Sequence, residues 1–501
     1  FYTATVYEKG AELVRMIKTI LGDDGFAKGL DLYFDRHDGD AATIEDFLSC
    51  FEDSAGHDLS QFKFWYEQAG TPQITVRTKY DANAGLFELD IVQMTLPTPG
   101  QEKKRPLHIP IRFGLLGQDG GDLTYGAVTG ADITGDVIHL KDAHQTVQFS
   151  GVLEKPVPSL LRGFSAPVRL SLTLDEDELI HLIGNDNDSY NRWQAMQTIA
   201  MRVLLNKIDC LRADTPPDDT YDCFFHGVEQ TIADDSLDPA FRAQFLAFPS
   251  EADVAQEIGT DVDPSIIHKA CLWLQQEVSS RANDTLITLF EKNQVREPYD
   301  PDGEQVGMRA LKNAALRLLA TGGDDGRRFA ETQYQVSDNL TDRMAALTAL
   351  VHCECEAATS ALHDFDKRYR SSPLVMDKWF AVQATSPHET TLATVKELMK
   401  HPVFSITNPN RIRALIGSFA AGNPSQFHRP DGAGYQFLSS VVVDLDQTNP
   451  QVAARLLTSF SAWPMLEQRR KERAERALRR VSNTAGLSTD VRDIVNRTLG
   501  T

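Results

Sequence analysis

The chain has 501 residues, of which 42% are hydrophobic and 24% are charged, and these values exclude wholesale disorder and a fibrous repeat. At roughly 150 residues per domain, this length predicts about three domains. The 50 Lys and Arg residues against 71 Asp and Glu residues leave a formal net charge of −21. The whole chain is therefore poorly suited to capture nucleic acid or an anionic membrane.

Apolar runs, the first residues and the use of cysteine together indicate where in the cell the protein is located. No run approaches the roughly 20 apolar residues that span a bilayer, and the start at Phe1 has neither a basic nor an apolar leader. Six scattered cysteines are typical of reduced thiols rather than of a disulfide framework. We therefore expect a cytoplasmic protein without integral membrane contact. Because the chain does not begin with Met, we also expect a processed product or a piece of a longer protein.

Residues 1 to about 70 are predicted to be helical. The spacing i, i+3, i+4, i+7 predicts one buried helix face from Leu13, Val14, Ile17, Ile20 and Leu21. A second face is predicted from Phe26, Leu30, Tyr33 and Phe34. Thr43 and Asp46 have the spacing of a capping box, which would begin a helix that buries Phe47, Leu48 and Phe51. Gly70, with Pro72 beyond it, predicts the end of the last helix.

After residue 72, the spacing of the apolar residues changes from the helical period of 3.6 residues to the strand period of 2. This change predicts a small β-sandwich over 72–174. Strands are expected near 74–76, 87–91, 109–113, 137–140, 147–149 and 168–172, with a hairpin turn at 81–85. Three histidines of this region, His108, His139 and His144, are interpreted as single surface or structural residues.

Amphipathic helices follow one another over 175–501. The density of helices predicts a stacked, superhelical all-α domain, although no repeat of fixed period is visible. The predicted fold class is therefore multidomain α+β, with segments 1–71, 72–174 and 175–501. The basic stretch 469–480 contains Glu472 and Glu475, which favours a solvated helix face over a nucleic-acid stripe.

Several catalytic motifs are absent from the sequence. The only His-Glu pair, His388-Glu389, does not continue into an H-E-x-x-H zinc helix, and there is no G-x-S-x-G, Walker or Rossmann pattern. His352, Cys353 and Cys355 are candidate metal ligands, but no second pair lies at zinc spacing, and buried thiols are the favoured interpretation.

Four residues are candidates for binding or catalysis. Arg413 and Arg455 each follow an Asn-Pro helix start, where an arginine can bind a carboxylate, although spacing alone favours an ordinary ion pair. Tyr2 and Tyr7 precede the first helix, and either residue can serve packing or donate to a developing oxyanion, because a phenol hydroxyl stays protonated at neutral pH. The sequence pattern alone leaves both alternatives open.

Six segments closely resemble bacterial aminopeptidase N, a family of zinc-dependent gluzincin aminopeptidases: FYTATVYEKGAE at 1–12, LDLYFDRHDGDA at 30–41, WYEQAGTP at 65–72, LVMDKWFAVQATSP at 374–387, NPNRIRALIG at 408–417 and NPQVAARL at 449–456. The resemblance covers essentially the whole chain and corresponds to the C-terminal part of the family. It implies that 1–71 is the C-terminal helical part of a thermolysin-like catalytic domain, 72–174 a β-sandwich, and 175–501 a helical domain that caps the active site.

The resemblance also implies a function, the removal of N-terminal amino acids from short peptides. In the family, two histidines and a glutamate hold zinc, a second glutamate is the general base, and all of them precede the segment present here. We therefore expect zinc only in the intact parent, no metal site in this chain, and no activity of the chain alone.

By the same resemblance, Tyr7 is expected to donate to the tetrahedral oxyanion, and Tyr2 to line the pocket for the first side chain of the substrate. Arg413 and Arg455 are expected to face the enclosed channel and to bind the peptide backbone or its carboxylate. The expected partners are short peptides and the missing N-terminal and catalytic segments, but not nucleic acid. The alternative is a non-enzymatic helical scaffold or interaction module, which an H-E-x-x-H motif in the coding sequence upstream of Phe1 would exclude.

Overall fold

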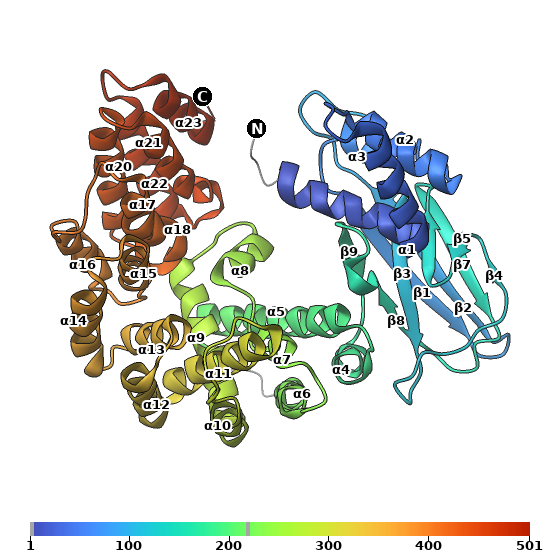
Figure 1. Cartoon of the computed structure of the whole chain (residues 1–501), viewed down its shortest axis with the longest axis horizontal. Helices are drawn as coiled ribbons and strands as arrows, with labels where there is room; N and C mark the ends of the chain where they lie inside the picture. The colour runs from blue at the N-terminus through green and yellow to red at the C-terminus, as the bar shows by residue number, and fades with distance from the viewer. Residues whose placement is uncertain (1–4, 217–220, 501) are drawn as a thin grey trace. The chain divides into compact units, whose positions relative to one another are not determined.

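The computed structural model describes residues 5–216 and 221–500 (Figure 1). It divides into two compact units, Phe1–Ile199 and Ala200–Thr501, and the division falls inside helix α5 (Ser189–Ala213). The predicted fold class is confirmed, because the chain combines a small pair of β-sheets with a large helical region. The boundaries predicted at 71/72 and 174/175 stay predictions, since neither coincides with the division between the two units.

The helices of the first unit begin with a π-helical turn. In chain order they are η1 (Thr5–Lys9), α1 (Gly10–His37), α2 (Ile44–Ala55), α3 (Phe64–Glu67), η2 (Arg162–Phe164) and α4 (Glu176–Asn185). The two helix faces predicted before residue 35 belong to one element, α1, which is kinked where Gly22 adopts φ +71°. The second face was predicted incorrectly at Phe34, whose side chain is 58% exposed.

The predicted capping box at the start of α2 is confirmed. The Thr43 hydroxyl accepts a hydrogen bond from the Asp46 N–H at 3.1 Å, and the Asp46 carboxylate accepts one from the Thr43 N–H at 2.9 Å. These two bonds satisfy backbone donors that the first turn of a helix leaves unpaired. Two of the three side chains predicted to face inward, Leu48 and Phe51, are buried.

Nine strands form the predicted β-sandwich. One sheet has the order β4-β7-β2-β1-β9, with β4 (Val128–Thr129), β7 (His144–Ser150), β2 (Leu86–Met94), β1 (Gln73–Asp81) and β9 (Arg169–Leu172). The other has the order β5-β6-β3-β8, with β5 (Asp132–Thr134), β6 (Val137–Leu140), β3 (Ile109–Leu116) and β8 (Val157–Leu160). The strands β4, β5 and β8 were not predicted. The first two have only two and three residues, and β8 contains Pro158, which weakens the strand signal of a run.

The predicted hairpin is the antiparallel pair β1 and β2, in register from Gln73↔Met94 to Asp81↔Leu86. Alternation along both strands places Ile74, Val76, Phe87, Leu89 and Ile91 in the interior. The last strand, β9, pairs with the other side of β1 in parallel orientation.

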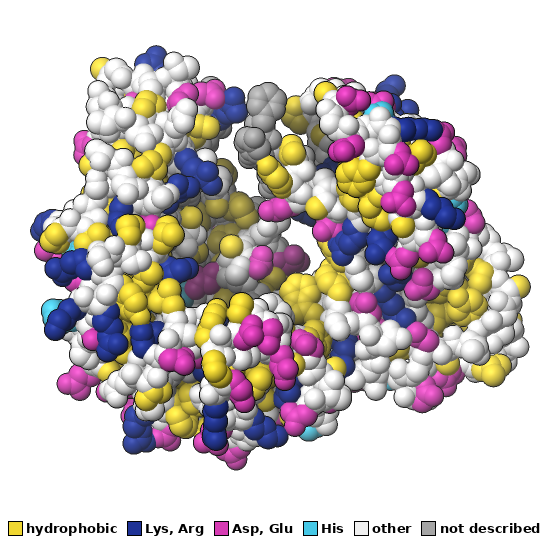
Figure 2. All heavy atoms as spheres, in the orientation of Figure 1, with side chains coloured by type: hydrophobic (Ala, Val, Ile, Leu, Met, Phe, Trp, Pro, Cys, Tyr) yellow, Lys and Arg dark blue, Asp and Glu magenta, His cyan; other side chains and the backbone are white. Residues whose placement is uncertain are grey.

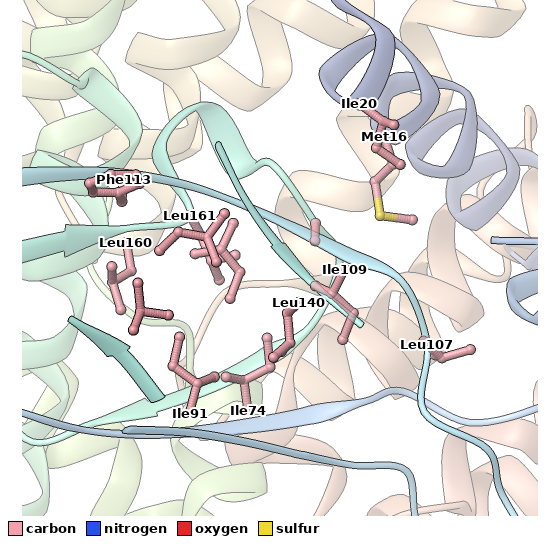
Figure 3. Close-up of a cluster of buried hydrophobic side chains, with 14 of the residues drawn as sticks. Met16, Ile20, Ile74, Ile91, Leu107, Ile109, Phe113, Leu140, Leu160 and Leu161 are labelled. Carbon is pink, nitrogen blue, oxygen red and sulfur yellow. The ribbon is translucent and has the colours of Figure 1, made fainter. Parts of the chain in front are cut away.

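One hydrophobic core joins the first helix to the sandwich. Figure 3 shows Met16 and Ile20 of α1 beside the cluster that includes Ile109 of β3 and Leu140 of β6, all of which are buried. The indole Nε1 of Trp65 donates to the His108 carbonyl at 2.9 Å in this interior. Residues 10–67 are therefore held by shared apolar burial, the dominant favourable term in folding.

The second unit is helical. After α5, its elements are α6 (Asp222–Ala233), α7 (Pro239–Phe245), α8 (Glu251–Ile258), α9 (Pro264–Arg281), α10 (Asn283–Lys292), α11 (Gly303–Gly322), α12 (Asp324–Val336), α13 (Leu340–His352), α14 (Ala357–Tyr369), α15 (Pro373–Ala384), α16 (Thr391–Leu398), α17 (Pro409–Ile412), η3 (Arg413–Gly417), α18 (Ser418–Gly422), α19 (Pro424–Phe427), α20 (Ala433–Asp446), α21 (Pro450–Leu457), η4 (Thr458–Phe460), η5 (Trp463–Met465), α22 (Gln468–Ser482) and α23 (Thr489–Leu499).

These helices stack in a repeating manner (Figure 1). Helices that are neighbours in the chain pack together, as in α10 with α11, α12 with α13 and α14 with α15. The odd-numbered helices also form a row, in which α9 contacts α11, α11 contacts α13, and α13 contacts α15. Within the described ranges, no helix combines the length and the apolar character needed to cross a membrane.

The basic helix α22 has the predicted solvated face, on which Arg469, Arg476 and Arg480 are exposed, but Arg470 is an exception. Arg470 is 3% exposed and forms ion pairs with Asp263 at 2.9 Å and with Glu467 at 3.2 Å. Arg479 lies on the exposed side and pairs with Glu475 at 2.7 Å. Figure 2 shows basic and acidic side chains interspersed on the visible surface of the helical unit.

Candidate functional site

Tyr7 lies in the π-helical turn η1, immediately before the long helix α1. Its side chain is 59% exposed, as is that of the neighbouring Val6. π-Helical turns are rare and often accompany functional positions. The other tyrosine candidate, Tyr2, lies outside the described residues.

The end of the η1 turn is attached to the segment that follows α3. The Lys9 ammonium group donates to the Gly70 carbonyl at 3.5 Å and lies 5.7 Å from the centre of the Trp65 ring. Burial lowers the pKa of Lys9, and the nearby charge of Lys104 lowers it further. Tyr7 therefore lies two residues before a lysine whose side chain contacts the end of the α3 segment.

Helix α1 has a second attachment, to the turn after β8. Arg15 donates from Nη1 to the Gly163 carbonyl at 2.9 Å, and its guanidinium lies 5.0 Å from the centre of the Phe164 ring. Glu12 accepts from Arg15 Nε at 2.9 Å and orients the same group. These contacts fix the direction of the helix that carries the Tyr7 turn.

The predicted Asn-Pro helix starts in the second unit are confirmed. The Asn408 side chain accepts from the Asn410 N–H at 2.9 Å, and the Asn449 side chain accepts from the Val452 N–H at 3.2 Å. The prolines stand at the first helical position in both cases, where a missing N–H removes no helical hydrogen bond.

The two candidate arginines are both exposed, but they differ in their partners. Arg413 is held within its own turn, because Nη2 donates to the Asn410 side-chain oxygen at 2.5 Å and Nε donates to the Pro409 carbonyl at 3.3 Å. Arg455 forms no ion pair with any residue in the described ranges, and it is exposed on α21 between the buried Ala454 and Leu456. Arg455 is thus the more available of the two for a ligand.

The elements that carry these arginines lie against each other at Gly417. A Cβ atom on Gly417 would lie 3.8 Å from Arg413 Cβ and 3.9 Å from Leu456 Cδ2, and Leu456 follows Arg455 directly. The structure therefore brings η3 and α21 together, although 41 residues separate the two arginines along the chain.

A buried arginine beside Arg413 was not identified from the sequence. Arg411 is 4% exposed, forms an ion pair with Asp377, and donates to the carbonyls of Pro373 at 2.8 Å and Val403 at 3.1 Å. It fastens the start of α17 to the start of α15. The sequence offered no signal for this role, because Arg411 and Arg413 both follow Pro409 closely, by two and four residues, and only tertiary contacts decide which of them is buried.

The histidines of the sandwich correct another sequence interpretation. His108 and His139 are not single residues but a buried pair, with His108 Nε2 2.9 Å from His139 Nδ1. Burial, with a smaller contribution from His139, lowers the pKa of His108 to about 3, and burial also lowers the pKa of His139. Both rings are therefore neutral at pH 7, and one ring nitrogen donates its proton to the other.

A zinc site in a protein needs several His, Cys, Asp or Glu ligands close together. Within 5–216 and 221–500, no group of three or more His, Cys, Asp or Glu side chains is arranged to hold one. His352, the first member of the candidate set with Cys353 and Cys355, instead donates from Nε2 to the Val382 carbonyl at 3.2 Å. The described residues therefore do not fit a zinc site.

Family models cover the chain in three consecutive segments. Residues 176–500 match a domain of unknown function (DUF3458_C) with ARM repeats, residues 70–173 match a second one (DUF3458) with an Ig-like fold, and residues 1–66 match the peptidase family M1 domain. The chain belongs to the DUF3458_C family. The ARM repeats of this family agree with the stacking of α9, α11, α13 and α15.

Curated relatives of this DUF3458_C member are aminopeptidases N. The chain is 37% identical over 503 residues to aminopeptidase N of Escherichia coli (strain K12), and 40% identical over 502 residues to aminopeptidase N of Caulobacter vibrioides. Each alignment covers 100% of this chain but only 57% and 56% of the relative. The predicted resemblance is confirmed: this DUF3458_C chain is homologous to the C-terminal part of bacterial aminopeptidase N.

A solved structure is similar over the same extent. The crystal structure of Legionella pneumophila aminopeptidase A in complex with aspartic acid has a TM-score of 0.85 and 27% sequence identity to this DUF3458_C chain, covering 100% of it and 57% of the Legionella chain. Tyr7 lies in the segment matched by the peptidase M1 model, and Arg413 and Arg455 lie in the ARM-repeat segment. The functional roles expected for these residues stay predictions.

Proposed function

We propose that this chain is the C-terminal portion of a zinc-dependent aminopeptidase that removes N-terminal amino acids from short peptides, in cytoplasmic peptide catabolism. The observation that carries the proposal is the alignment of the whole chain with aminopeptidases N at 33–40% identity. The chain spans a little over half of these relatives, so the activity of the complete enzyme is part of the proposal. The aspartic acid in the Legionella aminopeptidase structure is a free amino acid, the class of product that this reaction releases.

In this proposal Tyr7 stabilises the charge that develops on the scissile carbonyl oxygen. A phenol hydroxyl donates a hydrogen bond to an oxyanion without giving up its proton at neutral pH. The exposure of Tyr7 and the attachment of Lys9 two residues later support this role, because a donor contributes most when its position is fixed beforehand. Tyr2 would line the pocket for the first side chain of the peptide.

Arg413 and Arg455 would bind the far end of the peptide. A guanidinium group offers a planar pair of donors to a carboxylate, and such a pair is stronger than a neutral hydrogen bond. The exposed side chains of both arginines and the junction of their helices at Gly417 support a shared binding surface. The stacked helices would then restrict the channel to short peptides, which gives the second unit the role of a size filter.

Zinc would be held outside the described residues, which offer no suitable donor set. In the complete enzyme, bound zinc would supply an activated water and polarise the carbonyl group of the substrate. The printed sequence also contains no H-E-x-x-H motif. We therefore expect this chain to be inactive alone and to act with the missing N-terminal and catalytic segments.

The test compares the 501-residue chain with a form extended upstream to the length of its relatives. Both are assayed with an aminoacyl reporter substrate, and their zinc content is measured by elemental analysis. We expect hydrolysis and about one zinc per chain for the extended form only. Hydrolysis by the 501-residue chain with stoichiometric zinc, or no hydrolysis by a zinc-loaded extended form, would refute the proposal.

A further inference from the structure

A cavity of about 560 Å³ lies within the second unit, on the row of helices formed by α9, α11 and α13. Its wall is completed by Glu251 at the start of α8, by Arg327 of α12 and by the segment around His388. The volume is in the range of roughly 300–1,000 Å³ found for small-molecule sites. None of the residues expected to bind peptide substrates lies in this wall.

The cavity contains an arginine without an acidic partner. Arg317 of α11 donates from Nη2 to the Leu246 carbonyl at 2.9 Å, and it forms no ion pair with any residue in the described ranges. Its side chain remains accessible to solvent within the cavity wall, yet burial by the surrounding protein lowers the pKa of its guanidinium. The guanidinium of Arg317 therefore faces the cavity without an acidic side chain to neutralise it.

The arginines that are buried elsewhere in the described residues all have fixed partners. Arg309 donates to the Gln305 side chain and the Asp300 carbonyl, and four others each pair with an aspartate: Arg162, Arg242, Arg411 and Arg470. Such pairing is the usual condition for placing a guanidinium in a protein interior. With 71 acidic residues in the chain, the lack of one beside Arg317 leaves room for an anion from solution.

A second arginine adds positive charge to the same wall. Arg327 contacts the strongly exposed Asp324 at 3.1 Å, whereas its Nε is buried and has no hydrogen-bond partner among the described residues. An exposed carboxylate compensates a charge weakly, because water screens the pair. The cavity wall thus contains two guanidinium groups, those of Arg317 and Arg327.

The carboxylates of the cavity are already engaged by histidines. Glu251 Oε1 lies 2.7 Å from His268 Nδ1, and Glu354 Oε1 lies 3.1 Å from His388 Nδ1. The amide side chains of Gln275 and Gln276 supply neutral hydrogen-bond donors beside them. The wall therefore offers donors for an oxyanion, while its own acids are held by other residues.

We propose that this cavity binds a small oxyanion, a carboxylate or a phosphate, with Arg317 as its principal ligand and Arg327 as a second source of positive charge. The guanidinium fork of Arg317 has donors left after the bond to Leu246, and it can hold two oxygens of one anion. This site is separate from Arg413 and Arg455, and it goes beyond the proposed function, because it does not require peptide hydrolysis.

The test measures anion binding to the full 501-residue chain by calorimetry at constant ionic strength. The two probes are inorganic phosphate and N-acetylalanine, which carries a carboxylate. The probe that binds more tightly shows whether the cavity prefers a phosphate or a carboxylate. We expect saturable binding of at least one probe, weakened about 10-fold or more in Arg317→Gln. The matched control, Arg480→Gln at an exposed position of α22 outside the cavity wall, should bind within about 3-fold of the wild type.

Three results would overturn the proposal: no saturable binding of either probe, an unchanged affinity in Arg317→Gln, or a loss of binding in the control variant alone. Arg317→Gln removes a donor to Leu246 and can destabilise the fold, so its thermal unfolding is recorded first. If it does not fold, Arg317→Lys takes its place, since it keeps the charge but loses the fork. The site would also be refuted if both Arg317→Lys and Arg327→Gln fold and bind the probe as tightly as the wild type does. Arg327→Gln is included because it removes the second positive charge.

Discussion

The guanidinium of Arg162 and the carboxylate of Asp122 form a bidentate pair, with Nη1–Oδ2 and Nη2–Oδ1 distances of 2.7 Å. The hydrogen bonds from Arg162 lower the pKa of Asp122. Arg162 also lies 3.1 Å from the buried Asp186, whose pKa is raised because burial disfavours its charged form. Strand β3 makes room for this network at Gly114, where a Cβ atom would lie 2.0 Å from Arg162 Cζ.

Gly114→Ala should therefore destabilise the first unit by about 2 kcal/mol, because the new methyl group displaces a buried, paired guanidinium. Urea denaturation measures the change. The control is Gly184→Ala, an exposed position in α4 where a Cβ would meet nothing within 4 Å. That variant should be neutral or slightly more stable, because alanine favours a helix. Equal stability of the two variants would contradict this account of Gly114.

A buried ion pair in the second unit gives another prediction. Lys312 Nζ lies 2.6 Å from Asp342 Oδ2, and the two side chains are 4% and 7% exposed. Lys312→Met should cost about 3 kcal/mol in unfolding free energy, because it leaves a buried carboxylate without its cation. Lys312→Met with Asp342→Asn should recover part of this loss. Lys400→Met, which removes an exposed pair with Glu397, should change stability by less than about 0.5 kcal/mol.

The His108–His139 pair predicts a loss of stability in acid. Both pKa values are lowered in the folded protein, that of His108 to about 3, so the unfolded chain binds protons first as the pH falls below about 6.5. The unfolding free energy should then decrease by up to about 1.4 kcal/mol per pH unit for each histidine. His139→Gln should show a shallower decrease between pH 7 and pH 5. An identical pH dependence in the variant and the wild type would exclude this contribution.

The role proposed for Tyr7 is tested in the upstream-extended enzyme. Tyr7→Phe should lower kcat by about 10²-fold while KM changes little, because the lost hydrogen bond forms mainly in the transition state. Zinc content and thermal stability serve as controls and should match those of the unaltered enzyme. A kcat within a few-fold of the unaltered enzyme would show that Tyr7 does not stabilise the oxyanion.

The role proposed for Arg455 concerns substrates with a free carboxylate. Arg455→Gln should raise KM for short peptides and leave their amidated forms almost unaffected, since only the charged end loses a partner. The expected increase is about 10-fold, as for a hydrogen bond between charged groups. Equal effects on both kinds of peptide would reject carboxylate binding by Arg455.

Local patterns in the sequence predicted the features that depend on near neighbours in the chain. The Thr43–Asp46 capping box, the hairpin of β1 and β2, and the Asn408 and Asn449 helix caps all involve residues within a few positions of one another or one tight turn. Their geometry follows from backbone donors and acceptors that are close in any compact conformation.

Long-range pairing could not be predicted in the same way. His108 and His139 are 31 residues apart and meet because β3 and β6 align Ile109 with Leu140. A shift of one residue in that register would separate the two rings and turn their strands to the other face. The sequence contained both histidines but no information about the register.

The sequence by itself determined the order of helices and strands, the acidic surface and the kinship with aminopeptidase N, because periodicity, charge and homologous segments are properties of the linear chain. Only the tertiary structure decided which arginines are neutralised. Arg411 and Arg470 are buried against aspartates, Arg455 is exposed, and Arg317 lines a cavity without an acidic partner. The physical reason is that burial and ion pairing depend on contacts between helices far apart in the chain, and a guanidinium carries no local sign of which partner it will meet.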